Sequence, residues 1–189
     1  MKIKCCSLVA LLCAISASGL SAANINLGAS TSKTPYDRYL GPMWVVFKSL
    51  GGGHPDMAMV EQWVAEGRNF RYVYKSSEPW VPQAPEVTES TKAGDCKAKS
   101  LWLASKIDSA KVRFVIGKAK AVSNMNHAWL IWEGPEGWLI LDATLYSRPL
   151  APQTLSSSQF IPIYSFGPSG KYAHGVAAAA KGQKYGDHM

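Results

Sequence analysis

The chain has 189 residues, a formal net charge of +7 and a pI near 9.2. Its 47% hydrophobic content and seven Trp residues exclude a disordered chain and favour a packed domain. Nucleic-acid binding is not expected, because Lys and Arg occur singly, without a basic run interleaved with aromatic residues. We interpret the positive charge only as a general bias toward acidic partners or envelope surfaces.

The first segment, residues 1–23, has the pattern of a secretory signal peptide. Lys2 and Lys4 precede an apolar run at 8–15, and small residues continue to Ala23. We expect cleavage before Asn24, which gives a periplasmic or secreted protein. The alternative is an uncleaved anchor, but the run is shorter than the roughly 20 apolar residues that span a membrane. No later segment is long and apolar enough to span one.

The cysteines are distributed unevenly between this segment and the remainder. Cys5, Cys6 and Cys13 lie inside the predicted signal, so the mature chain keeps a single thiol, Cys96. Exported proteins usually pair their cysteines, and an unpaired thiol indicates a need for its chemistry. The alternative is a buried Cys that acts as a small hydrophobic residue. About 165 residues remain after cleavage, which is the size of one domain.

We divide the mature chain into an N-terminal arm at 24–54, a main domain at 55–166 and a flexible C-terminal tail at 167–189. The arm is polar and turn-rich from 24 to 42, and we expect it to be extended there. A short amphipathic helix is predicted at 55–66, ended by Gly67. Its inner face would hold Met59, Val60 and Trp63. A short strand is predicted at 70–74.

Three prolines between Ser76 and Gly94 predict an irregular loop. A helix is predicted over Cys96–Ile107, with Asp95 as its N-cap. Its inner stripe would comprise Ala98, Leu101, Trp102, Ala104 and Ser105. Strands are predicted at 112–122, 128–132, 138–141 and 160–166, with a hairpin turn at 134–137. One central helix followed by an antiparallel sheet predicts an α+β domain.

Three residues in this arrangement have the chemistry of a catalytic triad. Cys96 begins the predicted helix, where free N–H groups and the helix dipole stabilise a thiolate. His127 begins one strand of the hairpin, and Asp142 follows the end of the other. A hairpin brings both to the same open end, where the acid can orient the imidazole and the imidazole can pair with the thiol.

The sequence resembles the transglutaminase-like superfamily in three blocks: Gly94-Asp95-Cys96, His127-Ala128-Trp129 and Leu141-Asp142-Ala143-Thr144. It is most similar to the bacterial transglutaminase-like cysteine peptidases, and the similarity extends over about residues 60–144. Their aromatic and proline-rich lead-in resembles Phe70-Arg71-Tyr72, Trp80 and Pro85-Glu86. The resemblance implies a papain-like fold and a triad of Cys96, His127 and Asp142.

One position departs from the pattern of that branch. Its members often continue the Cys block with acidic residues, and some bind calcium there, whereas this chain has Lys97. Asp95 alone is a poor cage for an ion that takes six to eight oxygen ligands, so we expect no metal and no other cofactor. His54, His174 and His188 also lack partners at zinc-binding spacing. The serines at 156–158 lack the glycines of a nucleophile elbow.

The sequence therefore predicts an exported thiol-dependent peptidase or amidase that acts on a protein or peptide substrate through a thioester. An acyl-transferase would use the same triad, with an amine in place of water. A non-catalytic binding or assembly module on the same scaffold is the alternative from another functional class. The Cys96 N–H would donate one hydrogen bond to the oxyanion, and the sequence does not identify the second donor. We expect Trp80 either to pack in the core or to line the cleft near Cys96.

Overall fold

The computed structural model describes residues 25–77 and 80–175. Six strands form one antiparallel sheet in the order β1-β8-β7-β4-β5-β6. The strands are β1 Ala29–Thr31, β4 Val112–Lys120, β5 His127–Gly134, β6 Gly137–Leu141, β7 Gln159–Gly167 and β8 Gly170–Ala173. The predicted signal peptide and the end of the predicted tail lie outside the described residues.

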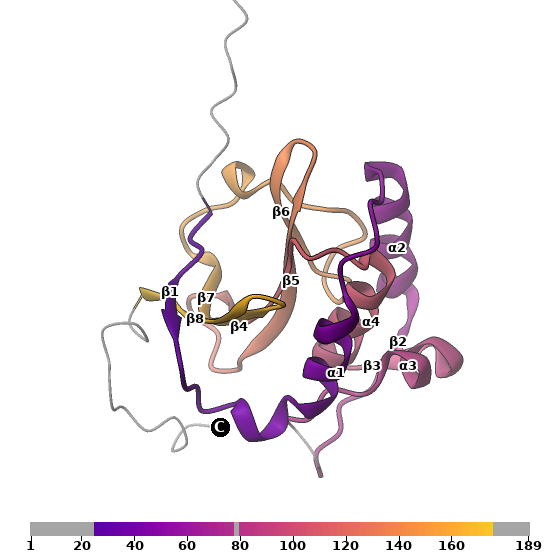
Figure 1. Cartoon of the computed structure of the whole chain (residues 1–189), viewed down its shortest axis with the longest axis horizontal. Coiled ribbons are helices and arrows are strands. Elements are labelled where there is room, and N and C mark those ends of the chain that lie inside the picture. Colours follow the sequence, from indigo (N-terminus) through magenta and orange to yellow (C-terminus); the bar gives the residue numbers. More distant parts are fainter. Residues whose placement is uncertain (1–24, 78–79, 176–189) are drawn as a thin grey trace, which may run out of the picture.

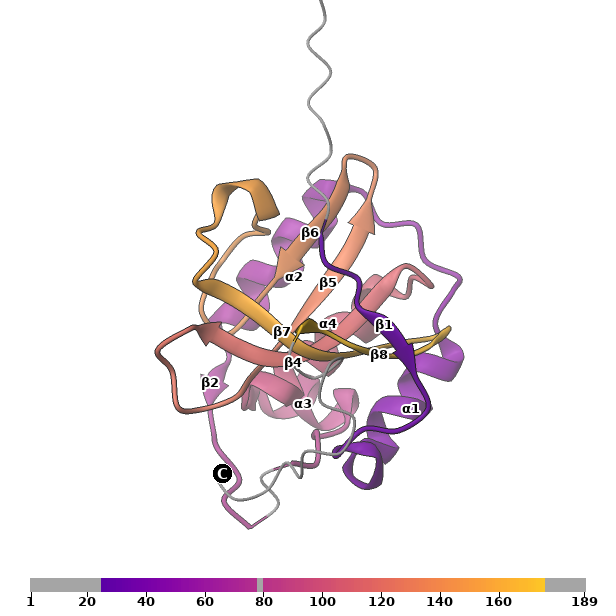
Figure 2. The ribbon, with the colours of Figure 1, turned by 90° about the vertical axis from the view of Figure 1, so that its left-hand side faces the viewer.

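Four helices lie together on one side of this sheet, while its other side carries loops and the N-terminal segment (Figures 1 and 2). The helices are α1 Gly41–Ser49, α2 Met57–Asn69, α3 Pro85–Thr91 and α4 Cys96–Ile107. A two-stranded parallel pair joins β2 Arg71–Tyr72 to β3 Ala93–Gly94. Single 3₁₀ turns occur at η1 Asp37–Tyr39 and η2 Pro152–Thr154. The predicted α+β class, with the Cys-bearing helix packed on an antiparallel sheet, is confirmed.

Helix α4 is the centre of the domain, and its predicted bounds are confirmed. Every residue at 96–104 is buried, as is Ile107, because α1, α2 and α3 cover the sides of the helix that the sheet leaves open. The predicted inner stripe is therefore only part of the buried surface. Asp108, in the left-handed conformation with φ of 49°, ends the helix. A helix enclosed on all sides holds its first residue, Cys96, in a fixed position.

The predicted strands that follow α4 are also confirmed, within two residues at their ends. The hairpin between β5 and β6 closes at the pair Gly134–Gly137, as the turn residues indicated. Further along the same hairpin, Leu130 pairs with Leu141. This register determines where the residues just beyond each strand meet.

The N-terminal segment is more structured than an extended arm, so that prediction is wrong in part. Short strand β1 pairs with β8, and helix α1 follows with Pro42 in its first turn. Tyr36, Leu40 and Phe47 are buried in the main core. Polar residues around these anchors masked the apolar positions that attach the segment to the body.

Helix α2 corrects the predicted end at Gly67, because it continues to Asn69. The glycine allows close packing, since a Cβ atom there would come within 2.8 Å of Trp102 and 2.9 Å of Ala143. The predicted inner face is also shifted: Val60 and Val64 are fully buried, whereas Met59 is 45% exposed. The helix begins after Asp56, whose side chain accepts a hydrogen bond from the Met59 N–H.

Two segments predicted to be irregular contain regular structure. Pro85 begins helix α3 instead of extending a loop, because a proline at the first helical position needs no N–H partner. In the segment predicted to be a tail, 170–173 form β8, which pairs with both β1 and β7. A Gly167–Gly170 turn joins β7 to β8. The glycine and lysine content of this segment indicated a flexible tail and did not reveal the hairpin.

The sheet separates two apolar clusters. The larger lies between the helices and the sheet and includes Leu101, Trp102 and Phe114. The smaller lies on the opposite face and includes Val115, Trp129 and Ile131. Alternate residues of β4 and β5 thus enter different clusters, as the period of a strand requires. Within the described residues, no helix is long and apolar enough to cross a membrane.

Candidate active site

A small cleft opens beside the first turn of α4. Its volume is about 170 Å³, and both Cys96 and His127 line it. Cys96 is the first residue of the helix and keeps 8% of its surface exposed. It is the one free cysteine among the described residues. The thiol therefore lies at the positive end of the helix dipole, with an opening toward solvent.

Asp95 fixes this end of α4. One of its carboxylate oxygens, Oδ1, accepts hydrogen bonds from the N–H groups of Lys97 and Ala98, each at 3.0 Å. The other, Oδ2, lies 2.5 Å from the Lys97 ammonium, and both side chains are almost wholly buried. The cap engages the second and third N–H groups of the helix and leaves that of Cys96 out. The Cys96 N–H therefore remains suited to an oxyanion.

This pairing bears on the expectation that no calcium binds at the Cys block. Both oxygens of Asp95 are already used, and the Lys97 ammonium stands where a cation would have to approach. Residues 25–77 and 80–175 contain no group of three or more His, Cys, Asp or Glu that could hold a metal ion. The donor set at this position does not fit calcium.

His127 and Asp142 meet through the register of the hairpin. Because Leu130 pairs with Leu141, the two side chains stand on neighbouring strands in a diagonal relation. The His127 Nε2 lies 2.8 Å from Asp142 Oδ2. Asp142 is 1% exposed, and its Oδ1 accepts from the N–H groups of Thr144 and Leu145. These two N–H groups fix the Asp142 carboxylate, and its other oxygen fixes the orientation of the His127 ring.

The pKa of His127 depends on both Asp142 and Cys96. Burial alone disfavours the imidazolium, but hydrogen bonds with Asp142 and with Cys96 raise the pKa of His127 to about 10. Since Nε2 pairs with Asp142, Nδ1 is the ring nitrogen left for Cys96. The ring also stacks on Trp129, with 6.1 Å between ring centroids. The structure thus brings Cys96, His127 and Asp142 into one hydrogen-bonded row.

The aromatic residues of the cleft were only partly anticipated from the sequence. Tyr72 and Tyr74 line it beside Cys96, and each is 51% exposed. Burial, together with the negative charges of Cys96 and Asp95, raises the pKa of Tyr72 to about 12. Pairing of β2 with β3 places Tyr72 opposite Gly94, two residues before the thiol. The register of this parallel pairing, which the sequence does not indicate, brings the Tyr72 side chain to the cleft.

Trp80 lines the same cleft, where its ring lies 5.9 Å from that of Tyr36. It is also packed against the main core, so both roles considered for it apply. Lys99, one turn beyond Cys96, is 1% exposed and donates to the Phe70 carbonyl at 2.7 Å. Burial lowers the pKa of Lys99. The polar neighbours of Cys96 in the sequence are thus buried supports of the site.

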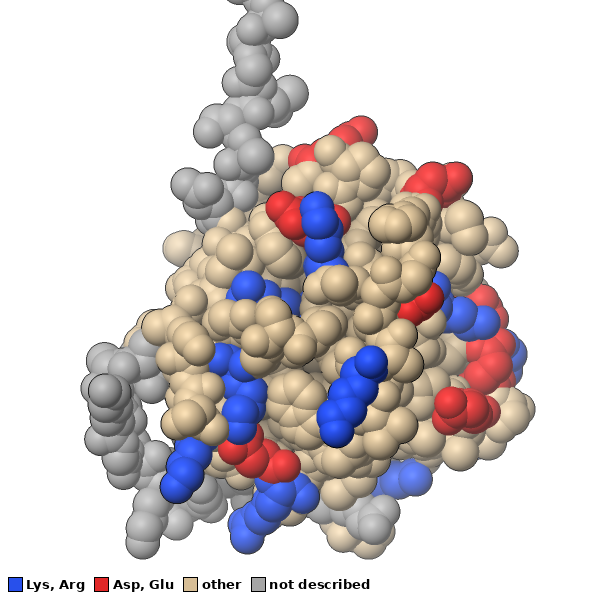
Figure 3. Space-filling view, viewed as in Figure 1, with Lys and Arg blue, Asp and Glu red and all other residues tan. Residues whose placement is uncertain are grey.

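Figure 3 shows how charged side chains are distributed over one face of the molecule. On the face seen in Figure 3, Lys and Arg side chains are separated by uncharged and acidic ones and form no continuous band. Several are engaged in ion pairs, among them Lys92 with Glu66 and Lys171 with Asp37.

This arrangement, with a Cys-bearing helix packed on an antiparallel sheet whose neighbouring strands supply His and Asp, is the papain-like, transglutaminase-like fold. Solved structures with this fold include LapG from Legionella pneumophila. Its calcium-bound form matches with a TM-score of 0.53 at 19% identity, over 82% of this chain and 85% of LapG. The EGTA-treated form matches with a TM-score of 0.52 at 20% identity, over 75% and 78%.

These identities establish likeness of fold. No protein-family model matches the sequence. No curated protein matches it either. The family resemblance found in the sequence is therefore supported at the level of three-dimensional structure, and the roles of individual residues must be argued from their own geometry.

Proposed function

We propose that this chain is a cysteine peptidase-like hydrolase that cleaves a protein or peptide amide with Cys96 as nucleophile, His127 as acid and base, and Asp142 as the group that orients His127. The observation that carries the proposal is the position of His127, hydrogen-bonded to Asp142 at 2.8 Å on one side and to Cys96 on the other. LapG, which has the same fold, is a transglutaminase-like cysteine protease.

The first half of the reaction uses the proton that Cys96 gives to His127. The thiolate attacks the substrate carbonyl, and the carbonyl oxygen becomes an oxyanion facing the Cys96 N–H. The raised pKa of His127 keeps the imidazolium protonated at neutral pH. It donates that proton to the amine nitrogen as the C–N bond breaks, which leaves a thioester on Cys96 and a neutral imidazole.

The second half returns the enzyme to its starting state. Neutral His127 takes a proton from water, the resulting hydroxide attacks the thioester, and the acid product leaves. Asp142 accepts the hydrogen bond from Nε2 and so holds the imidazole in the tautomer that presents Nδ1 to the sulfur. Tyr72 is our candidate for the second oxyanion donor. Its hydroxyl stays protonated to about pH 12, and it lies close enough to feel the charge of Cys96.

Turnover by Cys96→Ala tests the proposal. We expect loss of at least about a thousand-fold in peptide cleavage, because residues of a triad act as a unit. The melting temperature should change little, since truncating a side chain at a cleft costs less than the roughly 2–5 kcal/mol of a buried Leu-to-Ala change. Ser105→Ala, on the same helix, is the matched control. A variant that melts far below the wild type and a wild type without turnover on any peptide would favour the binding module.

We also propose that the protein acts in the periplasm or outside the cell. The support is the charge, apolar run and small-residue end of residues 1–23. Intact mass of the protein exported by a bacterial host should correspond to a chain that begins at Asn24. A mass that includes Met1 would contradict export with cleavage.

A further inference from the structure

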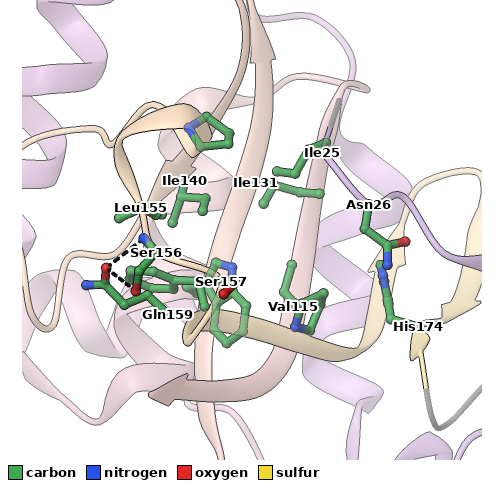
Figure 4. Close-up of a pocket in the computed structure, with 14 residues that line it drawn as sticks. Ile25, Asn26, Val115, Ile131, Ile140, Leu155, Ser156, Ser157, Gln159 and His174 are labelled. Atoms are coloured by element: carbon green, nitrogen blue, oxygen red, sulfur yellow. Dashed lines mark hydrogen bonds between the residues drawn. The ribbon is translucent and has the colours of Figure 1, made fainter. Parts of the chain in front are cut away.

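A second and larger cavity lies on the face of the sheet opposite the helices. Its volume is about 550 Å³, within the usual range of small-molecule sites. Val115, Ile131 and Ile140, from three neighbouring strands, form its floor (Figure 4). The N-terminal segment at Ile25 and the loop at Leu155 stand on either side. None of the proposed catalytic residues lines it.

The lining is uncharged throughout. Fourteen described residues surround the cavity, and none of them is Asp, Glu, Lys or Arg. Aliphatic side chains occupy the middle, while Asn26 and His174 lie at one end and Ser156 and Gln159 at the other (Figure 4). An ion in such surroundings would lose its hydration without gaining a counter-charge. The cavity therefore favours a neutral occupant with an apolar body.

His174 forms part of one polar end of the cavity. It keeps 2% of its surface exposed, and its Nε2 lies 2.8 Å from the Ser165 hydroxyl. Its Nδ1 has almost no exposed surface, because the turn at Gly28 covers the ring and the Asn26 backbone lies beside it. The imidazole is therefore a fixed part of the cavity wall.

The charge state of this imidazole agrees with a neutral partner. Burial, with the nearby positive charge of Arg113, lowers the pKa of His174 to about 4, so the ring is neutral at pH 7. Arg113 itself is held away, donating to the Leu27 carbonyl at 2.6 Å and stacked on Tyr172. The imidazole therefore adds no charge to the cavity at neutral pH.

The wall beside His174 is closely fitted to it. Gly28 has a φ of +70°, and a Cβ atom there would approach the imidazole to 2.9 Å. The Asn26 side chain accepts from the Gly28 N–H at 2.9 Å and so fixes the turn that covers the ring. A side chain at position 28 would collide with His174, so only glycine allows the turn that closes this polar end of the cavity.

We propose that this cavity binds a neutral small molecule with an aliphatic body and one hydrogen-bonding group, which meets the uncharged polar side chains at an end of the cavity. A medium-chain alcohol is the simplest member of this class. The apolar body covers the aliphatic floor, whose burial supplies most of the affinity, and the polar group selects the orientation.

Binding can be measured without any assay of catalysis. The fluorescent amine N-phenyl-1-naphthylamine, which is uncharged at neutral pH, is titrated into the full chain and then displaced by 1-decanol or by decanoate. We expect saturable binding and at least about ten-fold better displacement by the alcohol, because the lining offers no counter-charge. Equal displacement by the carboxylate, or no saturable binding, would overturn the proposal.

Two substitutions locate the probe. Ile131→Trp fills the floor, and Ser157→Trp places a large side chain at an exposed position of the wall, where folding is not at risk. Each should weaken probe binding by about ten-fold or more. Val45→Trp, at a site that is 73% exposed on α1 and so on the opposite side of the sheet, is the control and should bind as the wild type does. Probe binding unchanged in both cavity variants would overturn the assignment.

Discussion

The cleft beside Cys96 and the cavity behind the sheet differ in almost every property that matters for function. The cleft holds about 170 Å³, and the cavity about 550 Å³. Yet the smaller space is lined by Cys96 and by His127, which bonds to Asp142, whereas the larger has only a neutral imidazole. A choice by size alone would have led away from the ionisable groups.

The difference follows from what each space is built on. The cleft is formed at the end of an enclosed helix and the end of a hairpin, where hydrogen bonds fix each reactive atom. The cavity is closed by the N-terminal segment and by the loop around η2, which pack on the sheet through a smaller apolar cluster. Reactive groups need fixed positions, whereas an apolar ligand needs mainly volume.

The largest difference between an effect on turnover at the cleft and an effect on binding in the cavity is expected for Asp142→Asn. The amide oxygen can still accept from Thr144 and Leu145, but the new NH₂ group cannot accept from His127 Nε2. We expect a loss of about a thousand-fold or more in turnover, as in other triads deprived of the orienting acid. Probe binding in the cavity and the melting temperature should stay close to those of the wild type. Turnover unchanged in this variant would remove Asp142 from the triad.

The pH profile of the same variant gives a second check. In the wild type the imidazolium is needed to protonate the leaving amine, so activity should fall as the pH rises through about 10, the pKa of His127. Without the carboxylate, which helps to raise that pKa, the alkaline limb should move to lower pH. An alkaline limb that stays in place would show that Asp142 does not set the charge of His127.

A smaller effect is expected at Tyr72. Tyr72→Phe should lower kcat by about ten- to a hundred-fold, below the full effect of losing a fixed oxyanion donor, because the side chain is half exposed. KM and the alkylation rate of Cys96 should change little, since neither involves the oxyanion. Tyr74→Phe, in the same cleft, is the matched control. If both variants behave alike, Tyr72 is only part of the wall.

The smallest effect is expected from removal of calcium. Chelator should leave turnover within about two-fold of its value in added calcium, because Lys97 already neutralises Asp95 and that carboxylate has no free oxygen for an ion. Activity lost in chelator and restored by calcium would place a metal site in the protein that the Cys block does not provide.

Prediction from sequence succeeded where local signals were strong. The bounds of α4 followed from the cap at Asp95 and the helix-forming run after it. The row of Cys96, His127 and Asp142 followed from the hairpin turn, because two strands of known register bring their open ends together. Both results depend on contacts between residues close in the sequence or joined by a tight turn.

Prediction failed where long-range packing decides the structure. Gly67 was taken as a helix end, yet it lies inside α2. A glycine stands there because Trp102 and Ala143 leave no room for a side chain. Pairing of β1 with β8 joins the two ends of the described chain, which no local pattern indicates. The cavity lined by His174 arises from the same pairing, so it could not be anticipated.

Alkylation of Cys96 by iodoacetamide, followed across pH by peptide mass, tests the central claim most directly. A thiolate held by His127 and the N-terminus of α4 should react at a nearly constant rate from about pH 6 to pH 9, whereas an ordinary cysteine, with a pKa of about 8.5, loses reactivity as the pH falls below that value. His127→Ala should lose most of the reactivity at the acidic end. A wild-type rate that climbs about ten-fold per pH unit up to pH 8.5 would mean an ordinary thiol, and the proposed peptidase would have no nucleophile.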